Sequence, residues 1–410
     1  MVGRTLLLSL AFAALAQARM LPKADCTWST NTDLPSVQPL YIKPGAGLDI
    51  NSFWLPQNGD IVTVPEAGEV LFACPGSTLA GVGGSEALLT CVGGKTFADS
   101  NNNQYSFSSL SCSSWPAHTA VRRNGEQCQI SLPHSLVEIG FELSSGFFHL
   151  ITVCFDEVTY NTYQSFFTQT ADIDGYQSGL NRPSFTEGVG FYPDWLDVDY
   201  QYSRVGQKEA ISQALGSAAL ADQYIPDTGN YFLSRGHLAA NADFVYGAFQ
   251  RSTFYFLNVA PQWQTFNGAN WAQIEDSARD FAALQGNDLV VYTGTHGVTT
   301  LPDVNGNPAE IFVGYDLNTG AGILRVPHFF WKIVYEPATQ KGVAFVGLNN
   351  PYIDSPGTDF YMCPDVCDQI SWENWSPTVQ QSGYGYCCDV NTIKGLVPEM
   401  PDIVVTGLLA

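Results

Sequence analysis

This sequence of 410 residues has few charged residues, and most of them are acidic. Only 14% of the residues are charged, and 17 lysines and arginines stand against 39 aspartates and glutamates, which gives a formal net charge of -22. Proteins that bind phosphate chains over a wide area present a broad basic surface, and this composition excludes one. Any site for a polyanion must therefore be a small local group of cations.

Long apolar runs are also absent beyond the N-terminus, so no later segment is long enough to span a bilayer. At the N-terminus, Arg4 precedes the apolar run Leu6–Ala16, and Ala16-Gln17-Ala18 matches a cleavage pattern. This arrangement predicts an export signal over residues 1–18, with Arg19 as the first mature residue. A buried N-terminal helix is the alternative. We expect a secreted, extracellular protein without a membrane or protein partner.

Cysteine is missing between Cys154 and Cys363, which divides the ten cysteines into a group of six and a group of four. The first group is Cys26, Cys74, Cys91, Cys112, Cys128 and Cys154, and the second is Cys363, Cys367, Cys387 and Cys388. Even numbers in a secreted chain predict three disulfides in the N-terminal group and two in the C-terminal group, with the pairing open. A zinc site in the second group is the alternative, although vicinal cysteines fit a tetrahedral site poorly.

Several catalytic motifs are absent as well. The sequence has no G-x-S-x-G elbow, no H-E-x-x-H helix, no phosphate-binding P-loop and no G-x-G-x-x-G after a strand. Short alternating runs between Asn51 and Phe155 predict a small disulfide-stapled β domain at residues 19–165. The punctuated stretch from Asp172 to Tyr202 is interpreted as a linker or a wrapping segment.

Strands and helices alternate in the second half of the chain, which predicts an α+β domain at residues 166–410. The expected helices are Gln207–Ala221 and Asn267–Leu284. The expected strands are Phe254–Val259, Asp288–Tyr292 and Phe329–Tyr335, and Asn305-Gly306 predicts a hairpin turn.

The run Ser234-Arg235-Gly236-His237 places a cation two residues from an imidazole. In an extended strand, alternate residues share one face, so Arg235 and His237 can meet the same phosphate. An imidazole suits the removal of a proton from water, because its ordinary pKa is about 6.5. A purely structural histidine is the alternative.

A second group follows on the helix expected from Asn267. Asn267, Trp271, Glu275 and Arg279 are spaced four apart and form one stripe, and Asn267 is expected where the helix begins. Mg²⁺ needs few protein ligands and keeps most of its waters, so one amide oxygen and a nearby carboxylate suffice. Taken alone, Asn267 is also typical of an N-cap residue. Glu275 and Arg279, taken alone, are typical of a surface salt bridge.

Taken together, these motifs resemble the DNA/RNA non-specific endonuclease family, whose fold is the ββα-metal fold. The resemblance is carried by Arg235-Gly236-His237, by Asn258 with Pro261-Gln262, and by Asn267-x3-Trp271-x3-Glu275-x3-Arg279. It extends over residues 200–360. Within the family, the secreted crustacean duplex-specific nucleases look most similar.

The resemblance implies a role for each matching residue. His237 corresponds to the general base, Asn267 to the direct ligand of Mg²⁺ (or Mn²⁺), and Glu275 to the acid that orients metal-bound water. Arg235 and Arg279 correspond to the phosphate-stabilising arginines, and Asn258 to a residue behind the metal site. Ser234 departs from the family, because it stands where the motif has an aspartate.

The sequence therefore predicts a secreted metal-dependent endonuclease that prefers double-stranded DNA and leaves 5′-phosphates, with DNA–RNA hybrids or RNA as further substrates. Its activity is expected to fall as pH drops through the pKa of His237. The alternatives are a non-catalytic nucleic-acid- or carbohydrate-binding protein on a nuclease-like fold, and a nuclease that cuts RNA and single strands equally well. Further cations expected on a basic strip are Arg204, Lys208, Arg251 and Lys332.

Overall fold

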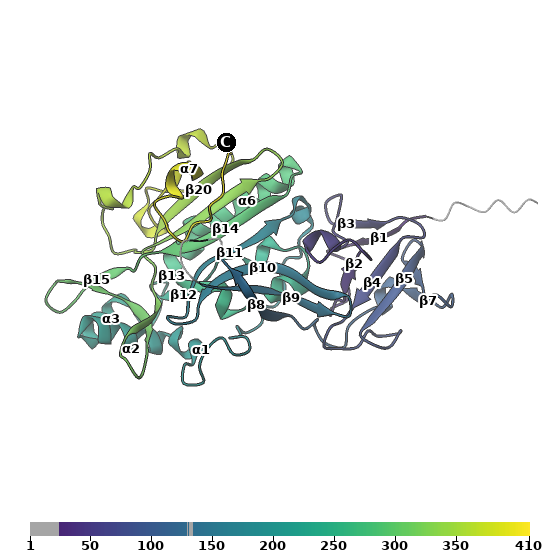
Figure 1. Cartoon of the computed structure of the whole chain (residues 1–410), viewed down its shortest axis with the longest axis horizontal. Coiled ribbons are helices and arrows are strands. Elements are labelled where there is room, and N and C mark those ends of the chain that lie inside the picture. The colour runs from purple at the N-terminus through teal and green to yellow at the C-terminus, as the bar shows by residue number, and fades with distance from the viewer. Residues whose placement is uncertain (1–23, 129, 131–133) are drawn as a thin grey trace, which may run out of the picture.

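The computed structural model describes residues 24–128, 130 and 134–410. The expected export signal at residues 1–18 lies outside these described residues. In the described part of the chain, no helix is long and apolar enough to cross a membrane. The architecture is mixed α+β, as predicted, with antiparallel pairing between nearly all neighbouring strands (Figure 1).

A nine-stranded sheet forms the centre of the molecule. Its strand order is β21-β20-β19-β14-β11-β10-β9-β8, with the short β22 (Gly407–Leu408) beside β20. The bounds are β8 Thr119–Gln127, β9 Ser135–Leu143, β10 Gly146–Asp156, β11 Asn161–Gln169, β14 Leu289–His296, β19 Phe329–Glu336, β20 Lys341–Leu348 and β21 Gly385–Cys388. Strands from both halves of the chain therefore share one sheet.

The sheet continues across the boundary that the sequence suggests between residues 165 and 166. That point lies inside β11, which pairs with β10 on one side and with β14 on the other. The alternating pattern of β8–β11 resembles that of the strands before it, so periodicity alone does not reveal which sheet these strands join. A break between residues 165 and 166 would have to split this sheet.

The preceding residues form a smaller β structure at one end of the molecule (Figure 1). Its five-stranded sheet has the order β2-β4-β5-β6-β7, and β1 pairs with β3 beside it. The bounds are β1 Cys26–Ser29, β2 Leu40–Ile42, β3 Ile61–Val64, β4 Glu69–Ala73, β5 Glu86–Gly93, β6 Thr96–Ala98 and β7 Gln104–Ser106. Trp28 stacks on Phe107 in its core, and Tyr41 packs against Tyr246 of the second half, so the two parts share a continuous apolar interior.

The disulfides confirm the predicted division into three and two. The pairs are Cys26–Cys91, Cys74–Cys112, Cys128–Cys154, Cys363–Cys388 and Cys367–Cys387. The zinc alternative for the last four cysteines is wrong, because each sulfur is bonded to another sulfur. Five disulfides are typical of proteins that fold in an oxidising compartment.

Two of the expected elements differ in the structure. The helix expected at Gln207–Ala221 is two helices, α2 (Arg204–Leu215) and α3 (Ala218–Tyr224), because Gly216 adopts a left-handed φ of 69° and Ser217 caps α3. The strand expected at Phe254–Val259 is wrong as well. The segment forms a 3₁₀ turn, η5 (Phe256–Asn258), and only Val259 enters a strand.

Further short elements lie outside the large sheet. They include α1 (Val198–Gln201), η4 (Asn241–Asp243), α4 (Gly247–Ser252), β17 (Phe312–Tyr315), β18 (Gly322–Arg325) and α7 (Val390–Ile393). The hairpin predicted at Asn305-Gly306 is confirmed, since β15 (Thr300–Pro302) pairs with β16 (Pro308–Glu310) across it.

A strand–strand–helix unit lies beside the sheet. β12 (Leu233–His237) pairs antiparallel with β13 (Val259–Trp263). The chain then enters α5 (Gln264–Phe266), a π turn η6 (Asn267–Trp271) and α6 (Ala272–Gln285) without a break. Trp271 is fully buried and packs against Phe330 of β19, with ring centroids 5.6 Å apart. This unit carries the residues that the motifs single out, except Asn258, which lies in η5 directly before β13.

Candidate active site

β12 presents Arg235 and His237 on one face, as their spacing predicts. Gly236 lies between them, opposite Ala260 of β13. A Cβ at Gly236 would lie 2.3 Å from the side-chain oxygen of Gln262, closer than two atoms can approach. Glycine is therefore required at this position for β12 and β13 to lie together with the Gln262 side chain between them.

The His237 ring is held between two aromatic rings. Its centroid lies 5.2 Å from that of Phe185 and 5.1 Å from that of Phe254. Burial lowers the pKa of His237 to about 3, and the positive charge of Arg182 contributes. The imidazole is therefore neutral near pH 7, and its buried Nε2 has no hydrogen-bond partner in the described part of the chain. A negatively charged phosphodiester beside the ring would raise this pKa towards that of a useful base.

Arg235 lies among three aromatic rings and forms an ion pair with one acid. Its guanidinium carbon lies 5.4–5.6 Å from the ring centroids of Phe185, Tyr202 and Phe256. A terminal nitrogen pairs with Asp199 at 2.5 Å, and the Asp199 side chain is 73% exposed. The cation is thus oriented by packing and held by an exposed carboxylate that a phosphate can replace.

The amide of Asn267 is oriented by Ser234. The Ser234 hydroxyl donates to the carbonyl oxygen of Gln262 at 2.8 Å, so it can only accept from the Nδ2 of Asn267, 3.0 Å away. The Oδ1 of Asn267 points elsewhere, and no hydrogen bond to it occurs among the described residues. A half-buried, oriented amide oxygen without a partner fits a hard divalent cation. Ser234 therefore replaces the charge of the motif aspartate with a hydrogen bond that sets the ligand's direction.

The helical run begins at Gln264, three residues before the expected start. Asn267 has helical backbone angles, φ -56° and ψ -45°, and lies inside the run. Both the N-cap alternative and the placement of Asn267 at the start of the helix are therefore wrong. Phe266 buries its ring against Trp271 and Phe330, which holds the extra turn in place.

Trp271, Glu275 and Arg279 share one side of the helix, as predicted. The alternative of a salt bridge between Glu275 and Arg279 is not what the structure shows. Arg279 pairs instead with buried Asp243 at 2.6 Å and with Asp276. The Arg279 side chain is only 12% exposed, so only the edge of its guanidinium group can contact a phosphate.

Lys332 lies beneath this stripe and not on the surface. It is 1% exposed, its Nζ donates to the hydroxyl of Thr293 at 2.6 Å, and it lies 5.3 Å from the Trp271 ring centroid. The expectation that Lys332 belongs to a surface strip is wrong. Burial raises the pKa of Glu275 to about 7, and the positive charge of Lys332 opposes this rise.

Asn258 is fully buried, and its side chain makes four hydrogen bonds. Its Oδ1 accepts from the Ala239 amide and from the Ser165 hydroxyl, and its Nδ2 donates to the carbonyl oxygens of Ala239 and Thr253. These bonds use the capacity of the amide, so no atom remains for metal-bound water. Asn258 instead fixes the backbone two residues after His237.

Arg182 is the functional candidate that sequence reasoning missed. It is exposed, and neither it nor Arg251 forms an ion pair within the described part of the chain. The segment around Arg182 wraps the site: Gln177 bonds to Val245, and Thr186 exchanges backbone hydrogen bonds with Phe254 and Phe256. The only signal in the sequence was a lone arginine in the acidic stretch from residue 172 to residue 202.

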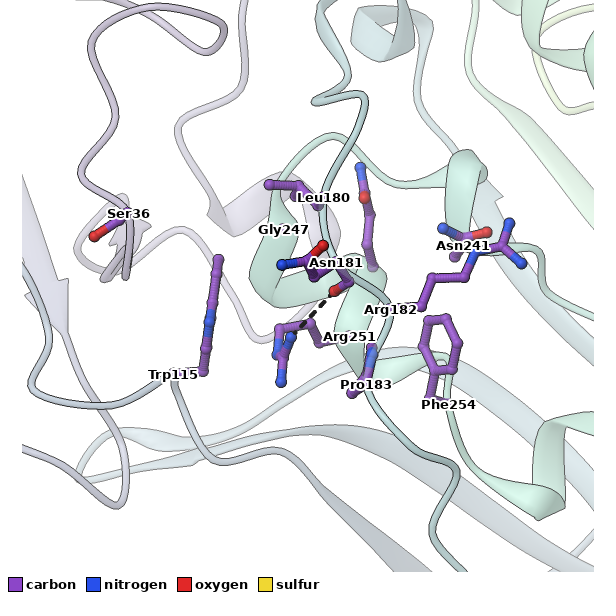
Figure 2. Close-up of a pocket in the computed structure, with 11 residues that line it drawn as sticks. Ser36, Trp115, Leu180, Asn181, Arg182, Pro183, Asn241, Gly247, Arg251 and Phe254 are labelled. Carbon is purple, nitrogen blue, oxygen red and sulfur yellow. Dashed lines mark hydrogen bonds between the residues drawn. The ribbon is translucent and has the colours of Figure 1, made fainter. Parts of the chain in front are cut away.

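The other expected cations have separate roles. Arg204 donates to the carbonyl oxygens of Pro226 and Gly229, and Lys208 pairs with Asp222 and Asp227. Both therefore hold α2 to a neighbouring loop. Arg251 instead lines a cavity of about 180 Å³ next to the site (Figure 2).

Comparisons with known proteins show which family this chain resembles. The model of the DNA/RNA non-specific endonuclease family matches residues 133–393. A "Salivary endonuclease" of Lutzomyia longipalpis is 29% identical over 338 residues, covering 82% of this chain and 74% of that protein. "Salivary protein Tsal1" of Glossina morsitans morsitans is 24% identical over 363 residues, covering 86% and 85%. A solved complex of EndoG with EndoGI is 21% identical, with a TM-score of 0.34, and covers 50% of this chain and 74% of that one.

Proposed function

The chain belongs to the DNA/RNA non-specific endonuclease family and is a nuclease, and from this premise we propose that it is a secreted, metal-dependent DNA endonuclease with His237 as general base. One observation carries the assignment of the base. The neutral imidazole has a buried Nε2 without a partner, on the strand face that also carries Arg235. A base that has no other bond to make is free to take a proton from water.

The metal assignment rests on the orientation of Asn267. Nucleases of this family depend on a divalent cation, and we propose Mg²⁺, with Mn²⁺ as a substitute, on the free Oδ1 of Asn267. Such an ion would neutralise charge on a non-bridging phosphate oxygen and on the leaving 3′ oxygen. Glu275, which forms no ion pair within the described part of the chain, would hold water molecules near that ion.

The protein's own side chains account for the remaining steps. His237 accepts the proton of the attacking water, and Arg235 leaves Asp199 to bind the phosphate. Arg182, whose charge acts on His237, and Arg279 would contribute positive charge that stabilises the extra negative charge of the transition state. Attack by water on phosphorus with loss of the 3′ oxygen leaves a 5′-phosphate.

For the substrate we propose DNA, with a preference for the double-stranded form, and DNA–RNA hybrids or RNA as weaker substrates. This preference rests on the motif resemblance alone. A nuclease that cuts RNA and single strands equally well remains the alternative. The non-catalytic alternative rested on Ser234 alone, which the structure explains as a residue that orients Asn267.

The test is cleavage of plasmid DNA, a matched single strand and a matched RNA, with Mg²⁺ and with excess EDTA. We expect cleavage with Mg²⁺ only, fastest on the duplex. The variant His237→Ala should be slower by roughly 10²–10⁴-fold while it keeps its fold, as circular dichroism would verify, and His149→Ala, in β10, serves as the matched control. An active His237→Ala variant, or cleavage in EDTA, would refute the assignment.

A further inference from the structure

A cavity next to His237 combines an aromatic wall, two cations and free amides. It has a volume of about 180 Å³ and is lined by residues from four separate stretches of the chain. The lining residues that matter here are Trp115, Asn181, Arg182, Asn241, Arg251 and Phe254 (Figure 2). Phe254 also packs against His237, with ring centroids 5.1 Å apart, so the cavity and the candidate base share one wall residue.

Trp115 is a rigid part of this wall. It follows Cys112, which is bonded to Cys74, and Ala117 donates its amide to the carbonyl oxygen of Pro75. Gly247, the first residue of α4, lies against this ring. A Cβ there would lie 3.0 Å from the Trp115 ring and 2.6 Å from Leu180, so glycine lets the ring approach α4.

The cations of the cavity have no acidic partner. The Arg251 guanidinium lies 5.0 Å from the Trp115 ring centroid and donates to the carbonyl oxygen of Asn181 at 3.5 Å. Arg182 extends towards Asn241 in Figure 2. In a protein of net charge -22, two unpaired arginines in one small cavity indicate an anionic ligand. The side-chain amides of Asn181 and Asn241 have no hydrogen-bond partner among the described residues.

We propose that this cavity is a subsite for one unstacked nucleobase of the strand being cut, with its flanking phosphate on Arg182 and Arg251. The proposal rests on the proposed nuclease function and adds a substrate class to it. An aromatic face, guanidinium groups and amides that can meet base edges are the combination with which proteins hold single-stranded nucleic acid. The cavity is too small for a base pair.

Whatever the overall strand preference, this subsite adds affinity for single strands and not for intact duplexes. A base inside a duplex must leave its stack and its partner to reach the cavity, whereas a base of a single strand has no partner to leave. The single strand therefore gains a contact on Trp115 that the intact duplex does not use. Trp115 comes from the region before β8, which gives that part of the chain a role in substrate binding.

The experiment measures kcat and KM of Trp115→Leu and Trp115→Phe on a single-stranded oligonucleotide and on the matched duplex. The oligonucleotide carries one cleavable linkage, and the others are nuclease-resistant. We expect Trp115→Leu to raise the single-strand KM about tenfold, a typical loss for one stacked base, with kcat and the duplex KM unchanged. Trp115→Phe should restore the KM. Trp54→Ala, in the same half of the molecule, is the matched control.

A second measurement separates this proposal from the nuclease function. Anisotropy of labelled oligothymidylate in EDTA, with the His237→Ala variant and with His237→Ala combined with Trp115→Leu, reports binding without cleavage. Weaker binding in the double variant supports the subsite even if the wild-type protein cuts nothing. An unchanged KM and unchanged binding in the leucine variants, or equal losses on single strand and duplex, would overturn it.

Discussion

Lowering the pH should change the protonation of the two titratable groups of the candidate site at different points, because the structure shifts their pKa values in opposite directions. Burial and Arg182 lower the pKa of His237 to about 3, and burial raises that of Glu275 to about 7. An ordinary histidine is only about 3% neutral at pH 5, whereas one with a pKa of about 3 is about 99% neutral. At the same pH, a carboxyl with a pKa of about 7 is ionised in only about 1% of molecules.

We therefore predict that protonation of Glu275 causes the loss of activity at low pH. The working form of His237 is neutral and is present above pH 3, while the working form of Glu275 is ionised and is lost as pH falls through about 7. At limiting Mg²⁺, kcat/KM on a short fluorescent duplex should fall by up to about 100-fold between pH 7.5 and pH 5. More Mg²⁺ should move the fall to lower pH, because a cation favours the carboxylate.

Glu275→Gln is the matched variant. It should be slow, with a nearly flat profile over the same range, and circular dichroism at each pH verifies the fold. A fall near pH 6.5 that persists in Glu275→Gln would refute the reasoning. So would an NMR titration, assigned with His237→Ala, in which the His237 ring takes up a proton near pH 6.5. The expectation that activity follows the pKa of an ordinary histidine is thus replaced by one that depends on the carboxyl.

Three further outcomes are expected. Asn258→Ala should lower the free energy of unfolding in urea by about 3 kcal/mol, because it leaves the Ala239 amide and carbonyl unpaired in the interior; a loss below about 1 kcal/mol would contradict its positioning role. Asp199→Asn should lower the KM for duplex DNA a few-fold by releasing Arg235, and an unchanged KM would show that this pair does not compete with phosphate. Binding should weaken with salt along a shallow log–log slope of about -2 to -3, since few phosphates are neutralised; a slope near -8 would reveal a wide basic surface.

The motif residues could be placed from the sequence because their spacing matches simple periodicities. Arg235 and His237 lie two apart on an extended strand, and Trp271, Glu275 and Arg279 lie four apart on a helix. Each spacing determines which residues share a face, whatever the rest of the fold does. The division of the disulfides followed from even counts in two separate groups of cysteines.

What could not be predicted depends on contacts between distant segments. Arg182 reaches His237 only because its segment crosses α4, and no local pattern encodes that crossing. Lys332 follows a run of buried aromatic residues and could equally have pointed outwards. The apolar run before Val259 is compatible with a strand, and only the hydrogen bonds of Asn258 to Ala239 and Thr253 account for the turn it makes.

The π turn from Asn267 to Trp271 places a limit on how this stretch of sequence can vary. Such a turn holds one residue more than an α-helical turn, and the run continues directly into α6. Loss of one residue here would return the run to α-helical spacing and rotate Asn267 by about 100° relative to Glu275. Substitutions of side chains on the outside of the turn are therefore tolerated, whereas an insertion or a deletion in the turn is not. Asn267, the proposed metal ligand, and Glu275 keep their relative orientation only while that residue count is kept.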